Sequence, residues 1–240
     1  MAVVEWKKDE SVALVTMTNG ENRHNPDFVK DMLGCLEQIK ADADIKAVVV
    51  TSNDPKNFCL GVDINWLGGR MGEKDMESIK KWMYGMNDVF KAFLLFPKPV
   101  IAAINGHAFG NGAIMACSCD FRFMRADRGF FCFPEVTIGI PFLPGMIAFV
   151  RKALPEYKFN EMYLTGKRVG AAELAQHGII EKASAGQDEL MADAVGFAKT
   201  LSLKPGIFGE MKKRKHKAII DIMDREDPPY VDSLFLMVQD

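Results

Sequence analysis

The chain has 240 residues, 48% of them hydrophobic and 26% charged, with a formal net charge of −2 at pH 7. These values suit one globular domain, or one domain with a small appendage. They exclude a global basic field that would attract nucleic acid, and no segment has the roughly 20 consecutive apolar residues of a membrane-spanning helix.

The five cysteines are scattered, without the paired Cys/His spacing of a zinc site. Reduced thiols in the core are the expected state, which favours a reducing compartment. The first ten residues lack the apolar segment of a secretory signal. We therefore expect a cytoplasmic protein with no metal, no membrane contact and no nucleic-acid partner.

Strands and helices alternate in the first half of the chain. Residues 11–18 alternate apolar and small polar side chains, as a half-buried strand does. Residues 25–27, Asn-Pro-Asp, are a typical helix start. Residues 47–51 and 100–104 are apolar runs typical of strands buried on both faces. Residues 74–96 predict a long helix, which the prolines that follow would end.

Helices dominate the second half. Residues 121–124 and 129–133 are strand-like, but beyond residue 141 the strand patterns fade. Five later segments suit helices: 147–154, 157–164, 171–177, 189–201 and 208–223. This order predicts an α/β core followed by a helical part. We place the core in residues 1–190 and the helical C-terminal part in residues 191–240.

Two glycine turns each follow a buried strand. In residues 58–63, Gly61 frees the backbone, so that the Val62 amide can point into a cavity. In residues 110–112, the Asn111 amide would lie at the positive N-terminus of the next helix. Two amides that converge on one point form an oxyanion hole. Such turns are also common in purely structural roles, so this pattern alone leaves both interpretations open.

Five sequence blocks follow one another in a specific order. They are residues 57–63; 98–106; 110–112 with 119–120; 134–135 with Gly139 and Pro141; and 164–167 with 171–173 and 178–180. In these blocks, over roughly residues 3 to 200, the chain resembles the crotonase superfamily, the enoyl-CoA hydratase/isomerase fold. The resemblance implies a ClpP/crotonase-type α/β fold, with a ββα-superhelix core and a helical C-terminal trimerisation part.

The resemblance also implies a substrate and an assembly. The substrate would be an acyl-CoA thioester, with coenzyme A as part of the substrate and no other cofactor. The backbone amides of Val62 and Asn111 would hold the thioester oxygen. The chain would form a homotrimer or hexamer through its helical part, which carries apolar residues available for burial: Phe208, Ile219, Ile222, Leu234, Phe235 and Leu236.

The number of carboxylates separates the reactions of this superfamily. Its hydratases carry one glutamate just after the glycine turn and a second in the Pro-Glu block, but here these positions are Ile114 and Glu135. Members with only the second acid resemble Δ3,Δ2-enoyl-CoA isomerases. We expect conversion of 3-enoyl-CoA to 2-enoyl-CoA, with Glu135 as proton shuttle and its pKa raised by burial. Asn111 stands where glycine is commoner, so its side chain could crowd the oxyanion hole.

Further residues are candidates for contact with the thioester: Arg23, Cys59, Gly61, Asp63, Ile64, Trp66, Leu67, Gly110, Ile114 and Phe133. The apolar ones suit a core equally well, and Asp63 suits the cap of the next helix. His107 is expected to be a packing or turn residue and Asp120 a structural acceptor. The basic run of residues 212–217 suits a solvated helix face, or a place near coenzyme A phosphates.

Two classes of alternative function stay open. One is another crotonase-type enolate reaction, namely acyl-CoA hydrolysis, decarboxylation or hydration. The other is a non-catalytic oligomer that binds acyl-CoA. An unpaired acid in an apolar block argues against the second alternative, because such a group is costly to keep without a use.

Overall fold

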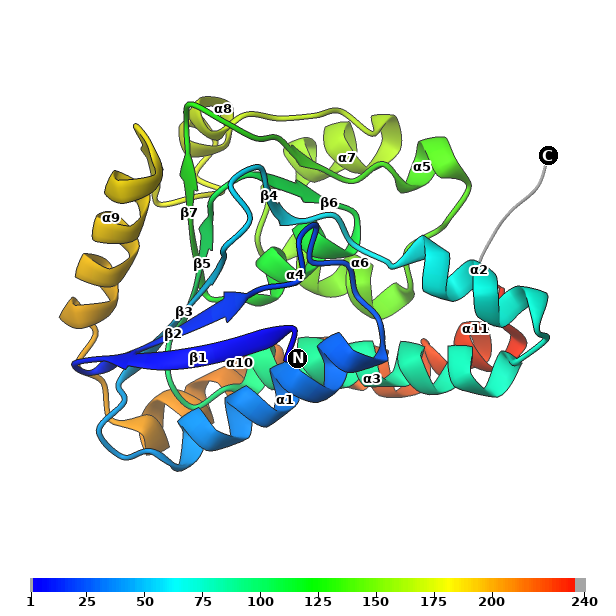
Figure 1. Cartoon of the computed structure of the whole chain (residues 1–240), viewed down its shortest axis with the longest axis horizontal. Helices are drawn as coiled ribbons and strands as arrows, with labels where there is room; N and C mark the ends of the chain where they lie inside the picture. The colour runs from blue at the N-terminus through cyan, green and yellow to red at the C-terminus, as the bar shows by residue number, and fades with distance from the viewer. Residues whose placement is uncertain (1, 236–240) are drawn as a thin grey trace.

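Two β-sheets form the frame of the computed structural model, which describes residues 2–235 (Figure 1). The strands of the larger sheet are, in spatial order, β1 (Val4–Asp9), β2 (Val12–Met17), β3 (Ala47–Ser52), β5 (Val100–Ile104), β7 (Phe121–Arg125) and β9 (Lys182–Ser184). β1 and β2 are antiparallel, and each later pair is parallel. The smaller, parallel sheet consists of β4 (Asn57–Cys59), β6 (His107–Phe109) and β8 (Phe131–Cys132).

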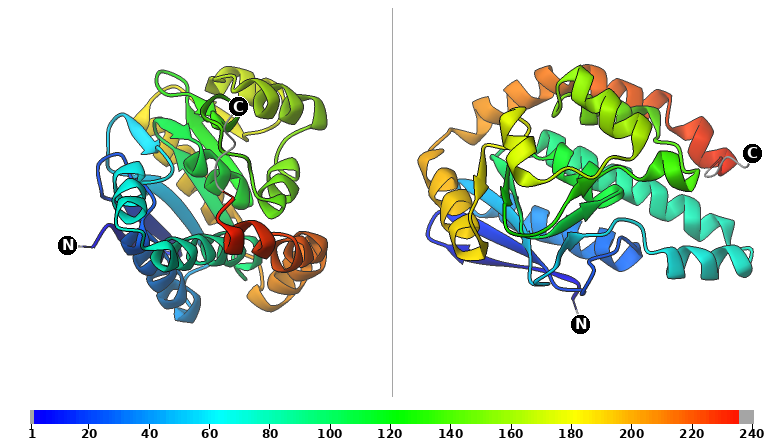
Figure 2. Two further views of the ribbon diagram at one scale, coloured as in Figure 1. Left: turned by 90° about the vertical axis from the view of Figure 1, so that its right-hand side faces the viewer. Right: turned by 90° about the horizontal axis from the view of Figure 1, so that it is seen from above.

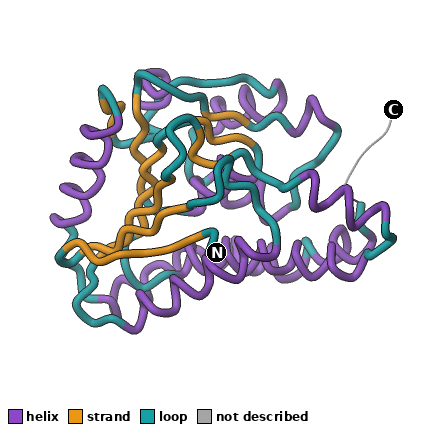
Figure 3. The backbone as a smooth tube through the Cα atoms, viewed as in Figure 1, coloured by secondary structure: helices purple, strands orange, loops and turns teal. Residues whose placement is uncertain are grey.

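Helices cover both faces of the larger sheet (Figures 1 and 2). On one face, α9 (Gln187–Thr200) packs against β3, β5 and β7. Successive side chains of a strand point to opposite faces. Val48 and Val50 of β3 therefore join the larger core, while Ala47 and Val49 pack beneath α9. Figure 3 shows the strands gathered side by side with helices around them.

The larger core lies among the other helices. These are α1 (Pro26–Ala41), α2 (Ile64–Gly72), α3 (Met76–Leu95), α4 (Asn111–Ser118), α5 (Glu135–Ile138), α6 (Pro144–Arg151), α7 (Glu156–Thr165), α8 (Ala171–Gln176), α10 (Pro205–Arg225) and α11 (Pro228–Ser233). Within residues 2–235, none of the helices combines the length and the apolar character needed to cross a membrane.

The α/β core and most predicted elements are confirmed. The strand expected at residues 11–18 is β2. Asn25 caps α1 as predicted, since its Oδ1 accepts the N–H of Phe28 at 3.1 Å. All six residues of β3 are buried, as an apolar central strand requires. The predicted long helix is α3, which begins at Met76 after its cap, Asp75.

Some elements differ from the sequence-based expectation. β1, β6 and β9 lie outside the predicted strands. β1 is an edge strand with one buried residue, Val4, so it has no apolar alternation to detect, and β9 has only three residues. α6 begins at Pro144, ahead of the predicted segment 147–154, because proline suits the first turn of a helix.

The predicted boundary between residues 190 and 191 falls inside α9. Leu190 and Ala198 of this helix both pack on the sheet. Met223 of α10 and Val231 of α11 join the larger core. The helical part thus shares its apolar contacts with the sheet, and a division into residues 1–190 and 191–240 stays a prediction.

Two glycines allow the smaller sheet to meet the turns beside it. A Cβ atom at Gly112 would lie 2.2 Å from the carbonyl oxygen of Cys59, and one at Gly106 would lie 2.1 Å from that of Lys56. Both neighbours are backbone atoms, which cannot rotate away as a side chain does. The absence of a side chain at these two positions therefore allows α4 and the loop before β6 to pack directly against the backbone of residues 56–59.

We expect Gly112→Ala to destabilise the protein by about 1–3 kcal/mol or more, the usual cost of overpacking a tight site. Gly196→Ala is the matched control, because Gly196 lies within α9 with nothing within 4 Å of the added methyl group. That variant should gain roughly 0.5–1 kcal/mol from helix propensity. Urea denaturation of both variants measures the difference, and equal stabilities would contradict the close approach.

Candidate active site

The backbone around Val62 has a fixed direction. The N–H of His24 donates to the carbonyl of Gly61 at 2.7 Å, and the N–H of Asp63 donates to the carbonyl of His24 at 3.0 Å. In a planar trans peptide, the carbonyl and the following N–H point in opposite directions. The Val62 N–H therefore points away from His24, and no backbone acceptor within residues 2–235 meets it.

Asn111 presents its amide at the N-terminus of α4. The carbonyl of Gly110 accepts the N–H of Ile114 at 2.9 Å, which closes the first helical turn. By the same planarity, the Asn111 N–H points out of the helix end, where unpaired amides and the helix dipole favour negative charge. Gly110 has a φ of +54°, a region that favours glycine. Its own N–H donates to Cys132, which ties the turn to β8.

The two turns and the glutamate lie together. A Cβ atom at Gly61 would be 3.0 Å from the amide nitrogen of Asn111. A Cβ atom at Gly110 would be 3.2 Å from Oε1 of Glu135. The Gly61 turn therefore lies against the Asn111 amide, and the carboxylate of Glu135 lies beside Gly110, a grouping that would suit an oxyanion hole with an adjacent base.

Glu135 is the first residue of α5 and is partly exposed. Its Oε2 atom is nevertheless buried and has no hydrogen-bond partner. Burial raises the pKa of the Glu135 carboxyl from 4.5 to about 7, and a hydrogen bond from its own backbone opposes this only in part. The direction agrees with the sequence-based expectation. A carboxyl near neutrality can both accept and return a proton at pH 7.

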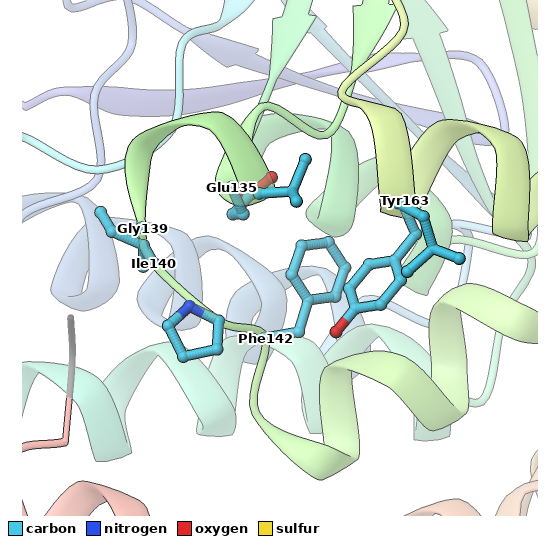
Figure 4. A pocket seen from close by; sticks show the side chains of 8 residues that line it. Glu135, Gly139, Ile140, Phe142 and Tyr163 are labelled. Carbon is cyan, nitrogen blue, oxygen red and sulfur yellow. The ribbon is translucent and has the colours of Figure 1, made fainter. Parts of the chain in front are cut away.

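An apolar pocket of about 210 Å³ begins at Glu135 (Figure 4). Its lining is Glu135, Val136, Gly139, Ile140, Pro141, Phe142, Tyr163 and Leu164. The rings of Phe142 and Tyr163 meet edge to face, 5.0 Å apart. Ile140, Phe142, Tyr163 and Leu164 were not predicted as site residues. Two of the sequence blocks reach this wall, the one with Gly139 and Pro141 and the one that begins at Leu164.

None of the ten predicted contact residues lines this pocket, and three of them lie in the core. Cys59 and Phe133 are fully buried, and Ile114 is 1% exposed. Cys59 turns inward, where its Sγ lies 3.1 Å from Nε2 of His24. Phe133 stands behind the pocket, with its ring edge to face against Phe142. The side chains of all three thus support the site from the core, and contact between Ile114 and a ligand stays a prediction.

The predicted residues of α2 lie beside the first turn and outside this pocket. Asp63 is the N-cap of α2, accepting the N–H of Trp66 at 3.0 Å, as the structural interpretation predicts. Ile64 is 60% exposed, whereas Trp66 and Leu67 are half-buried. Arg23 is held against the turn, because its Nη1 donates to the carbonyl of Val62 at 3.1 Å. Arg23 is also paired with Glu21 at 2.7 Å, so its cation lies beside the predicted oxyanion hole with a counter-ion.

Two other residues have the structural roles expected from the sequence. His107 lies between the rings of Phe109 and Phe130, and its Nδ1 accepts the Phe130 N–H. Asp120 accepts the N–H of Val100 at 2.9 Å, which fixes the start of β5. Neither side chain lines the pocket at Glu135.

Known proteins are similar to this chain. A sequence model of the enoyl-CoA hydratase/isomerase family matches residues 7–226. The chain belongs to the enoyl-CoA hydratase/isomerase family. It is 29% identical over 235 residues to peroxisomal enoyl-CoA delta isomerase 2 of Arabidopsis thaliana, an alignment that covers 94% of this chain and 96% of that protein.

Family members with a different named reaction are also similar. The chain is 31% identical over 180 residues to a short-chain-enoyl-CoA hydratase of Clostridium acetobutylicum, covering 73% of this chain and 66% of that protein.

The crystal structure of an enoyl-CoA hydratase/isomerase family protein from Pseudomonas syringae superposes with a TM-score of 0.86 at 24% identity, covering 96% and 97% of the two chains. The crotonase-type fold is thereby confirmed.

In this family member, the raised pKa of Glu135 predicts how stability changes with pH. Folding raises the pKa from 4.5 to about 7, so the folded state holds the proton more tightly than the unfolded chain. The contribution of Glu135 to stability is then fully present below pH 4.5 and is lost as pH rises through about 7. We expect the free energy of unfolding of the wild type to fall over this window relative to Glu135→Gln. Urea denaturation of both proteins across this range measures it, and parallel curves would contradict the buried carboxyl.

Proposed function

We propose that this protein isomerises 3-enoyl-CoA thioesters to 2-enoyl-CoA thioesters. The observation that carries the proposal is the single carboxylate of Glu135, with its raised pKa, beside the outward amides of Val62 and Asn111. Among the described residues that line the pocket, Glu135 is the one acid. Enoyl-CoA chemistry itself is supported by membership of the family.

Each group has a defined task in this reaction. The two amides donate hydrogen bonds to the thioester oxygen and stabilise the charge that develops there, each contributing about 10²–10³-fold to the rate. Glu135 removes a proton from C2, which gives a dienolate. It then returns that proton at C4, and the double bond moves from C3–C4 to C2–C3. Atoms and charge balance without water or a further cofactor.

The coenzyme A part of the substrate needs cations near its phosphates. Arg23 is bound to the turn that carries Val62, and Lys56 is an exposed lysine just before β4. We assign these two residues to the phosphates. The apolar acyl chain would enter the pocket walled by Phe142 and Tyr163.

Hydration is the second candidate, because the Clostridium acetobutylicum relative carries that name. The position at which hydratases of the superfamily hold their other glutamate is the buried Ile114. An aliphatic side chain cannot activate water, so we rank isomerisation first. Acyl-CoA hydrolysis, decarboxylation and simple binding of acyl-CoA are further alternatives with the same oxyanion hole.

We also propose that the protein assembles as a homotrimer or hexamer in the cytoplasm. Leu203, just before α10, and Ile207, on its first turn, are 42% and 59% exposed. Val136 and Leu164, beside the pocket, are exposed as well. Large apolar groups on a surface are typical of contact faces. Of the apolar residues expected to take part, Leu236 lies outside the described residues.

We expect Glu135→Gln to bind 3-enoyl-CoA with nearly unchanged affinity but to lose about 10²–10⁴-fold in turnover, the usual contribution of a positioned base. The assay follows the conjugated 2-enoyl product in a panel of 3-enoyl-CoA thioesters. Glu37→Gln, on the exposed face of α1, is the matched control and should keep full activity. A Glu135→Gln variant that keeps more than about a tenth of the rate would exclude Glu135 as the base.

The same proteins separate isomerase from hydratase. Wild type mixed with crotonyl-CoA should form no 3-hydroxyacyl-CoA. Rapid formation of that product would assign the chain to the hydratases, whatever the effect of Glu135→Gln on isomerisation.

Light scattering at micromolar concentration should give the mass of a trimer or hexamer. Ile207→Lys would place a charge on the exposed apolar face at the start of α10, and we expect it to shift the population toward smaller species. A wild-type protein that is monomeric throughout would refute the proposed assembly.

A further inference from the structure

The basic run at residues 212–217 divides between two faces of α10. Lys213, Arg214 and Lys217 are exposed, as a solvated face predicts. Lys212 and His216, one helical turn apart, are 4% and 2% exposed. The inner half of the run therefore serves a purpose that a solvated face does not explain.

These inner residues form part of a second cleft, of about 250 Å³. Its basic lining comes from three elements: α10, the start of β7 and the end of α6. The lining residues are Asp120, Phe121, Arg122, Lys152, Phe208, Met211, Lys212, Lys215 and His216. The cleft lies at the C-terminal end of α4, where Lys152 donates to the carbonyl of Cys117, whereas α4 begins at Asn111.

The cleft has more cations than counter-ions. Among its lining residues, Asp120 has the one carboxylate, and it forms an ion pair with Lys212 at 2.7 Å. Arg122 and Lys152 donate to neutral carbonyl groups at the end of α4, including that of Cys119. Lys215 is exposed at the rim. Within residues 2–235, none of Arg122, Lys152 and Lys215 has a carboxylate within ion-pair distance.

A buried polar atom in the cleft also lacks a partner. Nδ1 of His216 has no hydrogen bond. Burial, together with the charges of Lys152, Lys215 and Lys212, lowers the pKa of His216 to about 4. Burial, and to a smaller extent the positive charge of Arg122, lowers the pKa of Lys152 to about 8. A negative charge placed nearby would therefore stabilise the protonated, charged forms of His216 and Lys152.

We propose that this cleft binds a phosphate group, free or carried as an ester on an apolar body. Three cations without counter-ions suit a dianion, and His216, whose buried Nδ1 has no partner, lines the same cleft as Lys152. Phe121, Phe208 and Met211 form an apolar wall on which the body of an ester would lie. The site is independent of the isomerase proposal, because none of its residues lines the pocket at Glu135.

The test is a titration of the full-length protein with inorganic phosphate, followed by NMR of the histidine side chains. Ionic strength is held constant with sodium chloride, and His216→Gln assigns the signal. We expect a saturable shift of the His216 resonances and a rise of roughly 1–3 units in its pKa, as an adjacent opposite charge produces. No saturable change at millimolar phosphate would overturn the proposal.

Two variants of exposed lysines control for general electrostatics without disturbing the core. Lys215→Ser removes a charge at the rim and should weaken phosphate binding about fivefold, the effect of one unit charge at about 4 Å in water. Lys213→Ser removes the same charge from the outer face of α10 and should leave the affinity unchanged. Equal losses in the two variants would refute a specific site.

Phenyl phosphate then distinguishes the two sources of the group. Tighter binding than inorganic phosphate would support an ester whose apolar part contacts Phe208 and Met211, and Met211→Ser should remove that advantage. Equal affinities would support free phosphate as the natural occupant.

Discussion

The direction of two peptide groups is the constraint on which the site depends. An amide can stabilise a developing oxyanion only if it already points at it, since turning it during the reaction would cost the energy that it is meant to supply. In this protein the carbonyl of each of the two peptide groups accepts a hydrogen bond, which fixes the direction of the N–H on the other side. Gly61 is held through its carbonyl by His24, and Gly110 through its carbonyl by Ile114. Both contacts are made by backbone atoms, so the direction of the Asn111 amide is fixed without its side chain.

Glycine packing brings these two peptides within reach of each other. Gly61 touches the turn before α4, and Gly112 rests on the backbone of Cys59. A methyl group at either position would separate β4 from α4 and move the two amides apart. The separation of the two amides is thus a consequence of how closely the smaller sheet approaches one short helix, and the residues Cys59, Ile114 and Phe133 are buried on the core side of that contact.

The sequence predicts the parts of this arrangement that are local. The cap at Asn25, the buried strand β3, the two glycine turns and the isolated acid all have signals within a few neighbouring residues. The pocket wall does not, because Phe142 and Tyr163 are 21 residues apart and meet through the path of α6 and α7. For the same reason, adjacency in sequence suggested that Cys59 and Phe133 touch the ligand. The side of a turn on which a side chain lies depends on packing against distant segments. Both Cys59 and Phe133 pack into the core.

The two ends of α4 show how the charges of the molecule are distributed. Its N-terminus carries the Asn111 amide, where negative charge is favoured, and its C-terminal carbonyls accept hydrogen bonds from Lys152 and Arg122. An α-helix of this length spans only about 12 Å. Cations at one end and a developing oxyanion at the other therefore both complement the same helix dipole. An apolar surrounding strengthens that effect, and it also leaves Glu135 with a pKa near neutrality instead of a paired, permanently ionised carboxylate. The same short buried helix thus contributes to the surroundings of Glu135, to the proposed oxyanion hole and to the basic cleft.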